Sequence, residues 1–370
     1  MKKIAVFSFF GYNYGTVLQL YALYSIIKQS GNDADYIEFI EQFSPWRVKL
    51  GRIKRNLLGF FRSQKEYELD NQEYWNSYAF RKIKKKIDSF VGTEMSYKQV
   101  VYSEMGSLNE RYDIFLVGSD QIWSVRSLNE NSPALLGFVK DNKKKASYAP
   151  SFGTTQLDDS FIGLLKRSIS DFHYLSCRER SNALKLTSAL SRSVFCALDP
   201  TLLLNNDEWT CISSKYEMPK KYILCYILGE KKCIAEYAEN LGEKCSLPVY
   251  FILTRPFYKG KKNLLTDVGP REFLDLISNC SCLVTDSFHG IIFSINFSKP
   301  FYAFNKREGV NTGDNDRIKE ILKEFNLSDR FVEDGDKALG IDSIEYKGIQ
   351  AHLSQMRKES MDYLDAIINN

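Results

Sequence analysis

Short apolar runs alternate with helical patterns along the whole chain. Residues 3–9 form an apolar run, a glycine-bearing turn follows at 11–15, and residues 36–40 form a second run. Between the two runs, apolar residues recur at the spacing of a helix, at Val17, Leu20, Tyr21, Tyr24 and Ile27. The pattern predicts a strand–helix–strand unit whose helix ends at Gly31. The backbone N–H groups of its first loop are expected to point at a ligand above the sheet.

The alternation returns in two further series. Strands are expected at 114–117, 146–149, 174–177 and 193–197, each followed by a polar or glycine-bearing turn. From Lys220 onward, strands are expected at 222–228, 249–254, 282–285 and 300–304. Helices are expected at 232–241, where Gly242 ends the helix, and at 270–278 and 289–297. We therefore predict an α/β protein with two Rossmann-like domains that face a cleft, at 1–210 and at 218–370, the second ending in helices.

Residues 45–98 interrupt the first series. The segment from Trp46 to Arg62 contains six basic residues and no acidic one, and its apolar residues share one helical face. A second basic cluster follows at 81–86. We interpret this stretch as a basic helical insertion. It is either a solvated helix packed on the domain or a segment that binds an anionic membrane surface.

The composition excludes several classes of protein. The 370 residues carry 50 Lys and Arg against 46 Asp and Glu, and a net charge of +4 is too mild to indicate a nucleic-acid-binding protein. No run approaches the roughly 18 apolar residues of a membrane span, and the apolar start lacks a cleavage site. The eight cysteines form no CxxC pair and only three histidines are present, so we expect no metal site. A cytoplasmic location is expected.

Two polar elements follow predicted strands, where loops at one edge of a sheet form a ligand crevice. The segment 285–290 places His289 in the first turn of a helix, where a histidine either transfers protons or is structural. Ser119 and Asp120 follow the strand at 114–117. The Asp120 carboxylate could accept a proton from a hydroxyl, or it could cap the next helix.

Two basic elements could bind an anion. Arg178 ends the strand at 174–177, where its guanidinium suits a carboxylate or phosphate, although a structural pair with Glu179 or Asp199 is an alternative. A polar loop after the last strand contains Lys306, Arg307 and Arg317, and it either clamps an anion or is simply solvated.

Six motifs together resemble the polysaccharide pyruvyl transferase family. They are NYGTVLQLYAL (13–23), GSDQIW (118–123), YAPSFG (148–153), SCRE (176–179), LDPTLLL (198–204) and TDSFHG (285–290). The resemblance implies a fold similar to GT-B glycosyltransferases and phosphoenolpyruvate as the donor. It also implies that the product is a cyclic pyruvate ketal on a sugar of a surface polysaccharide or its lipid-linked precursor.

The resemblance, together with the chemistry and position of the residues, suggests roles in this chain, and Lys306, Arg307 and Arg317 are included for their place in the basic loop. His289 is expected to act as acid and base, and Asp120 as the base or orienting group for the acceptor hydroxyl. The expected substrate-binding residues are Arg178, Arg317, Arg307, Lys306, Asn13, Tyr14, Gly15, Ser119, Ser287 and Gly290. The reaction implied needs no metal or other cofactor. A lipid-linked acceptor would bring the enzyme to the inner face of the cell membrane.

One motif departs from the family pattern. Some members have Arg-Leu-His where this chain has Ser287-Phe288-His289. A guanidinium must therefore come from elsewhere, and we expect Arg178 and Arg317 to supply it from opposite domains. A GT-B-like glycosyltransferase that uses a nucleotide sugar, and a carbohydrate-binding or scaffolding subunit, are the alternative functions.

Overall fold

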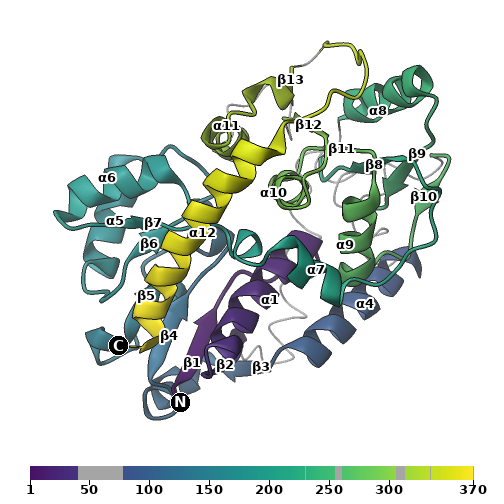
Figure 1. Ribbon diagram of the computed structural model, residues 1–370. Coiled ribbons are helices and arrows are strands. Elements are labelled where there is room, and N and C mark those ends of the chain that lie inside the picture. The colour runs from purple at the N-terminus through teal and green to yellow at the C-terminus, as the bar shows by residue number, and fades with distance from the viewer. Residues whose placement is uncertain (41–77, 230, 255–260, 306–312, 334, 370) are drawn as a thin grey trace, which may run out of the picture.

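Two parallel β-sheets form the framework of the protein (Figure 1). The computed structural model describes residues 1–40, 78–229, 231–254, 261–305, 313–333 and 335–369. The first sheet has the order β3-β2-β1-β4-β5. Its strands are β1 (Lys3–Phe7), β2 (Asp33–Ile40), β3 (Tyr97–Val101), β4 (Ile114–Val117) and β5 (Lys145–Ser147). Two short strands, β6 (Ser176–Cys177) and β7 (Phe195–Cys196), pair with each other next to β5.

The second sheet has the order β10-β9-β8-β11-β12-β13. Its strands are β8 (Ile223–Tyr226), β9 (Val249–Ile252), β10 (Leu264–Leu265), β11 (Cys282–Thr285), β12 (Phe301–Phe304) and β13 (Phe331–Val332). Neighbouring strands are parallel in both sheets. We call the part built on β1–β7 the first half and the part built on β8–β13 the second half.

Helices pack on both sheets (Figure 1). They are α1 (Tyr14–Gln29), α4 (Tyr78–Glu94), α5 (Asp159–Ile169), α6 (Arg180–Leu190), α7 (Asn206–Ile212), α8 (Lys232–Cys245), α9 (Pro270–Asn279), α10 (Phe288–Asn296), α11 (Gly313–Glu324) and α12 (Tyr346–Asn369). The predicted α/β fold with two Rossmann-like units is therefore confirmed. The proposed domain limits, 1–210 and 218–370, remain a prediction.

One helix end was predicted wrongly. Gly242 does not end the helix that begins at Lys232, because α8 continues to Cys245 and ends at Ser246, whose φ of 53° is left-handed. A Cβ at Gly242 would lie 2.4 Å from Cγ2 of Val249 and 2.9 Å from the carbonyl oxygen of Leu247. The glycine thus permits close packing of the helix on the following strand.

The two faces of the first sheet contact different cores. On β1, Ile4 and Val6 belong to one cluster of buried apolar residues, and Ala5 and Phe7 belong to another. Successive residues of a strand point to opposite faces, so a strand buried on both sides reads as a continuous apolar run. This explains why the sequence pattern predicted the strand.

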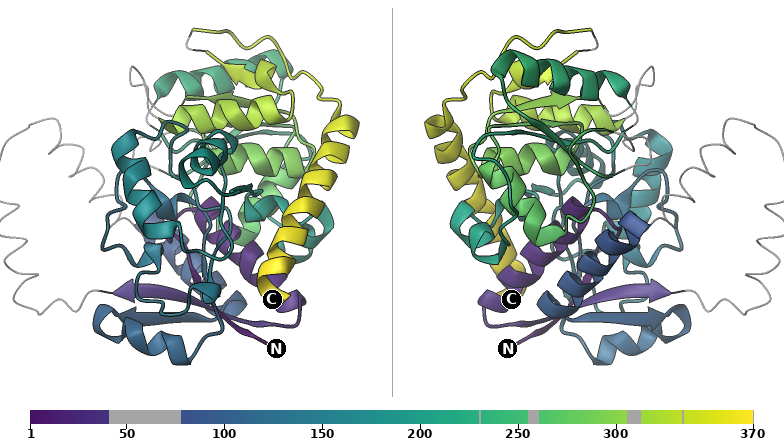
Figure 2. Two further views of the ribbon diagram at one scale, coloured as in Figure 1. Left: turned by 90° about the vertical axis from the view of Figure 1, so that its left-hand side faces the viewer. Right: turned by 90° about the vertical axis from the view of Figure 1, so that its right-hand side faces the viewer.

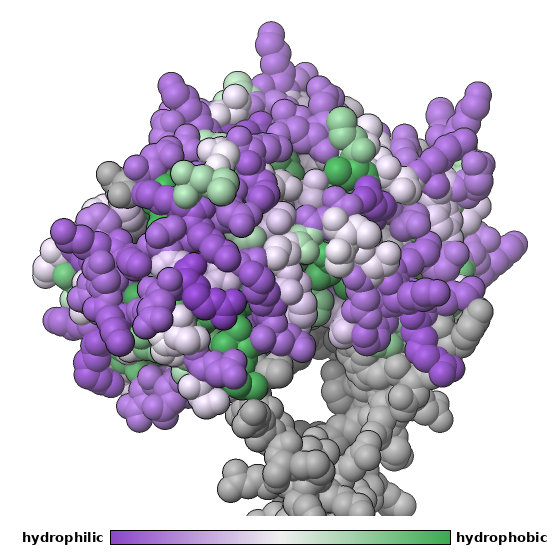
Figure 3. Space-filling view, turned by 90° about the horizontal axis from the view of Figure 1, so that it is seen from below, coloured by the Kyte–Doolittle hydropathy of each residue, from purple (hydrophilic) through white to green (hydrophobic). Residues whose placement is uncertain are grey.

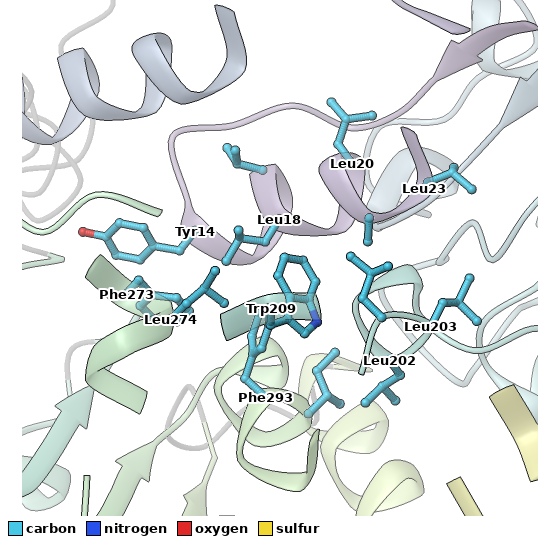
Figure 4. Packing of buried hydrophobic residues seen from close by; sticks show 14 of the residues in the cluster. Tyr14, Leu18, Leu20, Leu23, Leu202, Leu203, Trp209, Phe273, Leu274 and Phe293 are labelled. Carbon is cyan, nitrogen blue, oxygen red and sulfur yellow. The ribbon is translucent and has the colours of Figure 1, made fainter. Parts of the chain in front are cut away.

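A single apolar core joins the two halves (Figure 4). Tyr14 and Leu18 of α1 face Phe273 and Leu274 of α9, and Trp209 of α7 fills the space between the halves. The rings of Tyr14 and Phe273 stack with their centroids 4.6 Å apart. Because α1 is covered by both halves, its apolar residues extend around most of its circumference.

The C-terminal helix α12 crosses from the second half to the first (Figures 1 and 2). Near its start, the hydroxyl of Tyr346 donates to the carbonyl of Lys299 at 2.5 Å. Farther along, the Ser360 hydroxyl accepts a hydrogen bond from the N–H of Leu198 at 3.1 Å, and Tyr363 donates to the carbonyl of Ser147 at 3.3 Å. The helix thereby ties the two halves together.

The described part of the insertion is a helix packed on the core. Ile83 and Ile87 of α4 are buried, and Lys86 pairs with Glu272 of α9 at 2.8 Å. The basic cluster at 81–86 therefore belongs to a helix packed on the protein. This agrees with the first of the two predicted alternatives, a solvated helix packed on the domain. The basic segment from Trp46 to Arg62 lies outside the described residues.

The surface seen from below is largely hydrophilic, with hydrophobic residues in small scattered patches (Figure 3). Among the helices that the structure describes, none is both long and apolar enough to span a membrane.

Candidate active site

The candidate site lies where the strand order of each sheet reverses. In the first sheet the chain moves outward from β1 to β3 and returns on the other side of β1 as β4. The second sheet does the same at β8 and β11. Loops that follow strands at such reversals form the ligand crevice of open α/β sheets. Asp120 follows β4 and His289 follows β11.

Asp199 lies at the centre of a group of buried charges. Its Oδ2 atom is 2.6 Å from Nη1 of Arg178 and 3.6 Å from Nε2 of His289. Its Oδ1 atom accepts hydrogen bonds from the N–H of Thr201 at 3.0 Å and from the Thr201 hydroxyl at 2.8 Å. One carboxylate therefore links a guanidinium of the first half to an imidazole of the second half.

Arg178 has further acidic neighbours in the first half. Its Nη2 atom lies 3.5 Å from Oδ1 of Asp120, and its Nε atom lies 4.0 Å from Oε1 of Glu179. The other oxygen of Asp120 accepts a hydrogen bond from the Thr16 hydroxyl at 3.1 Å. The ion pairs considered for Arg178 are thus present, and Asp120 helps to hold the guanidinium in place. Binding of an anion by Arg178 stays a prediction.

Arg317 reaches the same place from α11 in the second half. Its Cζ atom lies 5.9 Å from the centre of the Phe288 ring, while that of Arg178 lies 4.5 Å from it. Turned so that its oxygen faces the guanidinium, the amide of Gln121 accepts hydrogen bonds from Nη2 of Arg317 at 2.8 Å and from Nη1 at 3.3 Å. The two arginines expected to converge from opposite domains therefore do so around Phe288.

We call these residues the charged cluster: Asp120, Arg178, Glu179, Asp199, His289 and Arg317. Each is less than one-tenth exposed. A pocket opens beside the cluster, and its lining includes Arg178, Asp199, Phe288 and Arg317. Groups that combine fixed positive charge with a histidine at a strand-to-helix turn suit an anionic substrate that must gain or lose a proton.

Burial and opposite charge compete in the charged cluster. Burial raises the pKa of Asp199, but His289 and Arg178 together with hydrogen bonds bring it well below its usual range. Burial lowers the pKa of Arg178, and three neighbouring carboxylates raise it above its ordinary value. For Glu179, burial prevails over Arg178 and Arg317, so its pKa is raised. Asp199 is therefore a fixed negative charge, whereas Glu179 is more easily protonated than an ordinary glutamate.

The first turns of two helices, α10 and α1, meet at the side chain of His289. The residue lies in the first turn of α10, which is capped by the Ser287 hydroxyl accepting from the N–H of Gly290 at 3.3 Å. The first turn of α1 lies against the imidazole, since a Cβ at Gly15 would be 2.2 Å from Cγ of His289. The partial positive charge of helix N-termini favours bound anions.

The structure places the other predicted site residues in supporting positions. The Asn13 side chain caps α1 and also accepts from the Tyr226 hydroxyl at 3.2 Å, and Tyr14 donates to the carbonyl of Val268 at 3.0 Å. The Ser119 hydroxyl donates to the carbonyl of Ala149 at 2.9 Å. These side chains join segments of the fold, so a direct contact with substrate remains a prediction for them. Lys306 and Arg307 lie outside the described residues.

Sequence reasoning did not name several residues of the site as functional. Asp199 and Glu179 were considered only as partners of Arg178, and Gln121 and Ser151 only as parts of motifs. Ser151 accepts a hydrogen bond from Nη1 of Arg317 at 3.5 Å and donates to Glu179. Each follows a strand in a recognised motif, which is the signal that could have identified them. No group of three or more metal-ligating side chains occurs in the described parts of the chain.

The sequence matches the family model of polysaccharide pyruvyl transferases over residues 13–306. The chain belongs to the polysaccharide pyruvyl transferase family, as its motifs predicted. Its members are transferases that act in polysaccharide biosynthesis. None of the curated proteins compared with the chain matches it significantly.

Solved structures of other proteins share the fold. The Arabidopsis thaliana protein UGT89C1, complexed with quercetin, is 10% identical with a TM-score of 0.50, covering 100% of this chain and 98% of that protein. The S. aureus protein MnaA, in a co-structure with UDP, is 12% identical with a TM-score of 0.51, covering 98% of this chain and 88% of that protein. Both likenesses extend over the whole chain and support the GT-B-like arrangement of two Rossmann-like domains.

Proposed function

We propose that this protein transfers the pyruvyl group of phosphoenolpyruvate to two hydroxyls of a sugar, forming a cyclic ketal and releasing phosphate. The sugar belongs to a surface polysaccharide or to its lipid-linked precursor. Family membership supports a transferase that acts on a polysaccharide. The observation that carries the donor assignment is the convergence of Arg178 and Arg317 on Phe288 beside His289. Phosphoenolpyruvate has a phosphate and a carboxylate, and guanidinium groups bind both kinds of anion well.

The proposed reaction begins with a proton. His289, oriented by Asp199, protonates C3 of the donor, so the methylene becomes a methyl group and positive charge develops at C2. One sugar hydroxyl then attacks C2 and loses its proton. The second hydroxyl attacks C2 as the bond from C2 to the phosphate oxygen breaks, and the ring closes. Of the two protons released by the hydroxyls, one replaces the proton consumed at C3 and the other leaves with phosphate.

The charges of the site have separate tasks in this scheme. Arg178 and Arg317 bind the anionic donor and stabilise phosphate as it leaves. Asp120 remains our proposed base for the acceptor hydroxyl, and it also positions Arg178 through the 3.5 Å contact. The chemistry is acid–base chemistry on the substrates and needs no cofactor. Use of a lipid-linked acceptor at the inner face of the membrane is part of the proposal.

The test is to supply phosphoenolpyruvate with a panel of methyl galactosides and N-acetylmannosaminides. We expect inorganic phosphate to be released and the acceptor to gain the mass of a pyruvate ketal. His289→Ala should lower turnover by about 10²–10⁴-fold with little change in melting temperature. The matched control is His173→Ala, since His173 is exposed.

Two results would contradict the proposal. Release of a nucleoside diphosphate from a nucleotide sugar would favour a glycosyltransferase. Full activity of the His289→Ala enzyme would remove the proposed proton donor while leaving the reaction itself in place.

A further inference from the structure

A second pocket opens at the carboxyl end of the first sheet. Its volume is about 250 Å³. The lining comes from the ends of β1 and β2 and from short loops beside them, and it includes Ser8, Phe9, Glu38, Phe39, Tyr102 and Ile122. We call it the aromatic pocket. The reaction scheme above does not use it.

Two aromatic residues of this pocket, Phe9 and Tyr102, are open to solvent. The residue exposure of Phe9 is 46% and that of Tyr102 is 40%, among the few large hydrophobic residues that are exposed in the described chain. Tyr102 lies against Phe39, with ring centroids 5.8 Å apart, and Phe10 lies 6.2 Å from Tyr36. An exposed ring held in place by another, as Tyr102 is by Phe39, offers a flat apolar surface without a large entropic penalty on binding.

A carboxylate also lines the pocket. Oε2 of Glu38 accepts hydrogen bonds from the amide of Gln99 at 2.8 Å and from the Tyr97 hydroxyl. These bonds hold the carboxylate beside Tyr97, on the opposite face of the sheet from Phe39. The pocket therefore combines aromatic rings with one fixed negative charge at its edge.

The aromatic pocket adjoins the charged cluster. The Ser8 hydroxyl donates to the carbonyl of Ser119 at 3.1 Å, and Ser119 immediately precedes Asp120. On the other side, Ile122 of the pocket follows Gln121, whose amide contacts Arg317. The loops after β1 and β4 thus form both sites, at the strand reversal where ligands bind in this type of sheet.

We propose that the aromatic pocket binds a neutral sugar ring of the acceptor. This inference rests on the proposed function, because it supplies the second substrate of that reaction. A pyranose has apolar C–H faces that can stack on Phe9 and Tyr102, while the Glu38 carboxylate lies across the end of the strand from these rings. The same carboxylate repels an acidic sugar such as a uronic acid, so the pocket selects neutral sugars over uronic acids.

The test measures sugar binding without the donor. Saturation-transfer NMR with methyl galactoside, methyl mannoside and methyl N-acetylmannosaminide should show binding of at least one of these sugars, and methyl glucuronide should bind more weakly. Phe9→Ala and Tyr102→Ala should each weaken that binding by about tenfold, while phosphoenolpyruvate affinity is unchanged. Leu184→Ala is the matched control, because Leu184 is 68% exposed on α6 and outside both sites.

The outcomes separate this inference from the proposed function. Arg317→Lys should weaken phosphoenolpyruvate binding but not sugar binding. Equal sugar affinity of wild type, Phe9→Ala and Tyr102→Ala would overturn the aromatic pocket as the acceptor site, as would the absence of binding by every neutral sugar of the panel. If the sugar binds as expected but phosphoenolpyruvate releases no phosphate, the pocket stands and the proposed donor is wrong.

Discussion

At the scale of single residues, the sequence could predict those site residues that directly follow a strand. His289, Asp120 and Arg178 occupy such positions, and the structure brings them into one cluster with Arg317. The contact of Asp199 with His289 was not predictable. It joins residues from opposite halves, and no local pattern of sequence encodes which loops meet across a cleft.

Replacing the Asp199 carboxylate should destabilise the protein in a pH-dependent way. Asp199→Asn leaves Arg178 buried without its nearest counter-charge, so the free energy of unfolding should fall by about 3–5 kcal/mol at pH 7. The pKa of Asp199 is lowered in the folded state, so its stabilisation is present above the pKa of the unfolded chain, about 4, and is lost as the pH falls through the folded value.

Urea unfolding of both proteins at several pH values checks this prediction. The difference between wild type and Asp199→Asn should shrink below about pH 4. The exposed Asp362 provides the control, because Asp362→Asn should change stability little at any pH. A difference independent of pH would mean that Asp199 acts through packing and not through its charge.

At the scale of elements, strongly patterned segments were predicted well and short edge strands were not. The buried strands β4 and β11 have the predicted bounds. In contrast, β10 and β13 contain two residues each, too few for any periodicity to appear. The role of a glycine was also ambiguous. A sequence cannot distinguish a glycine that ends a helix from one that lets a helix approach its neighbour.

Two helical glycines should respond oppositely to alanine. Gly15→Ala would place a methyl group 2.2 Å from Cγ of His289, so it should cost about 1–3 kcal/mol of stability and displace the imidazole. At Gly92 of α4, no heavy atom of the described residues lies within 4 Å of the place that a methyl group would take, so Gly92→Ala should stabilise the protein by up to about 1 kcal/mol. Thermal unfolding and phosphate release measure both effects. Equal behaviour of the two variants would mean that α1 does not press on His289 in solution.

At the scale of the whole molecule, the two-domain fold was predictable but its common core was not. Periodicity shows that a helix buries a face, without showing which element covers that face. Here α1, α7 and α9 meet in one apolar cluster, and α12 spans both halves. The boundary between the halves is therefore a packed interior and not a loose contact between separate domains.

A packed boundary predicts that the halves unfold together. Leu364 of α12 is fully buried in the common core, and Leu364→Ala should lower the free energy of unfolding by about 2–5 kcal/mol. Differential scanning calorimetry should show one transition, shifted to lower temperature. Leu184→Ala, at an exposed position, should leave it within about 0.5 kcal/mol of wild type. Two separate transitions in the wild-type protein would contradict a shared core.

The balance of charge in the charged cluster has a consequence for substrate uptake. Among the described residues, the carboxylates of Asp120, Glu179 and Asp199 outnumber the guanidinium groups of Arg178 and Arg317. A donor with a phosphate and a carboxylate brings further negative charge into a buried place, which is costly unless it is compensated. The compensation at hand is a proton on Glu179, whose pKa burial has already raised.

Phosphoenolpyruvate should therefore carry protons from the solvent into the protein as it binds. The heat of binding then depends on the buffer, because each proton taken up is first released by a buffer molecule. Calorimetric titrations in PIPES and in Tris should give different enthalpies for the same affinity, and the difference should become smaller in Glu179→Gln. Equal enthalpies in both buffers would show that the site receives its donor without any exchange of protons. If protons are taken up, the protein neutralises part of the donor's negative charge in the act of binding it.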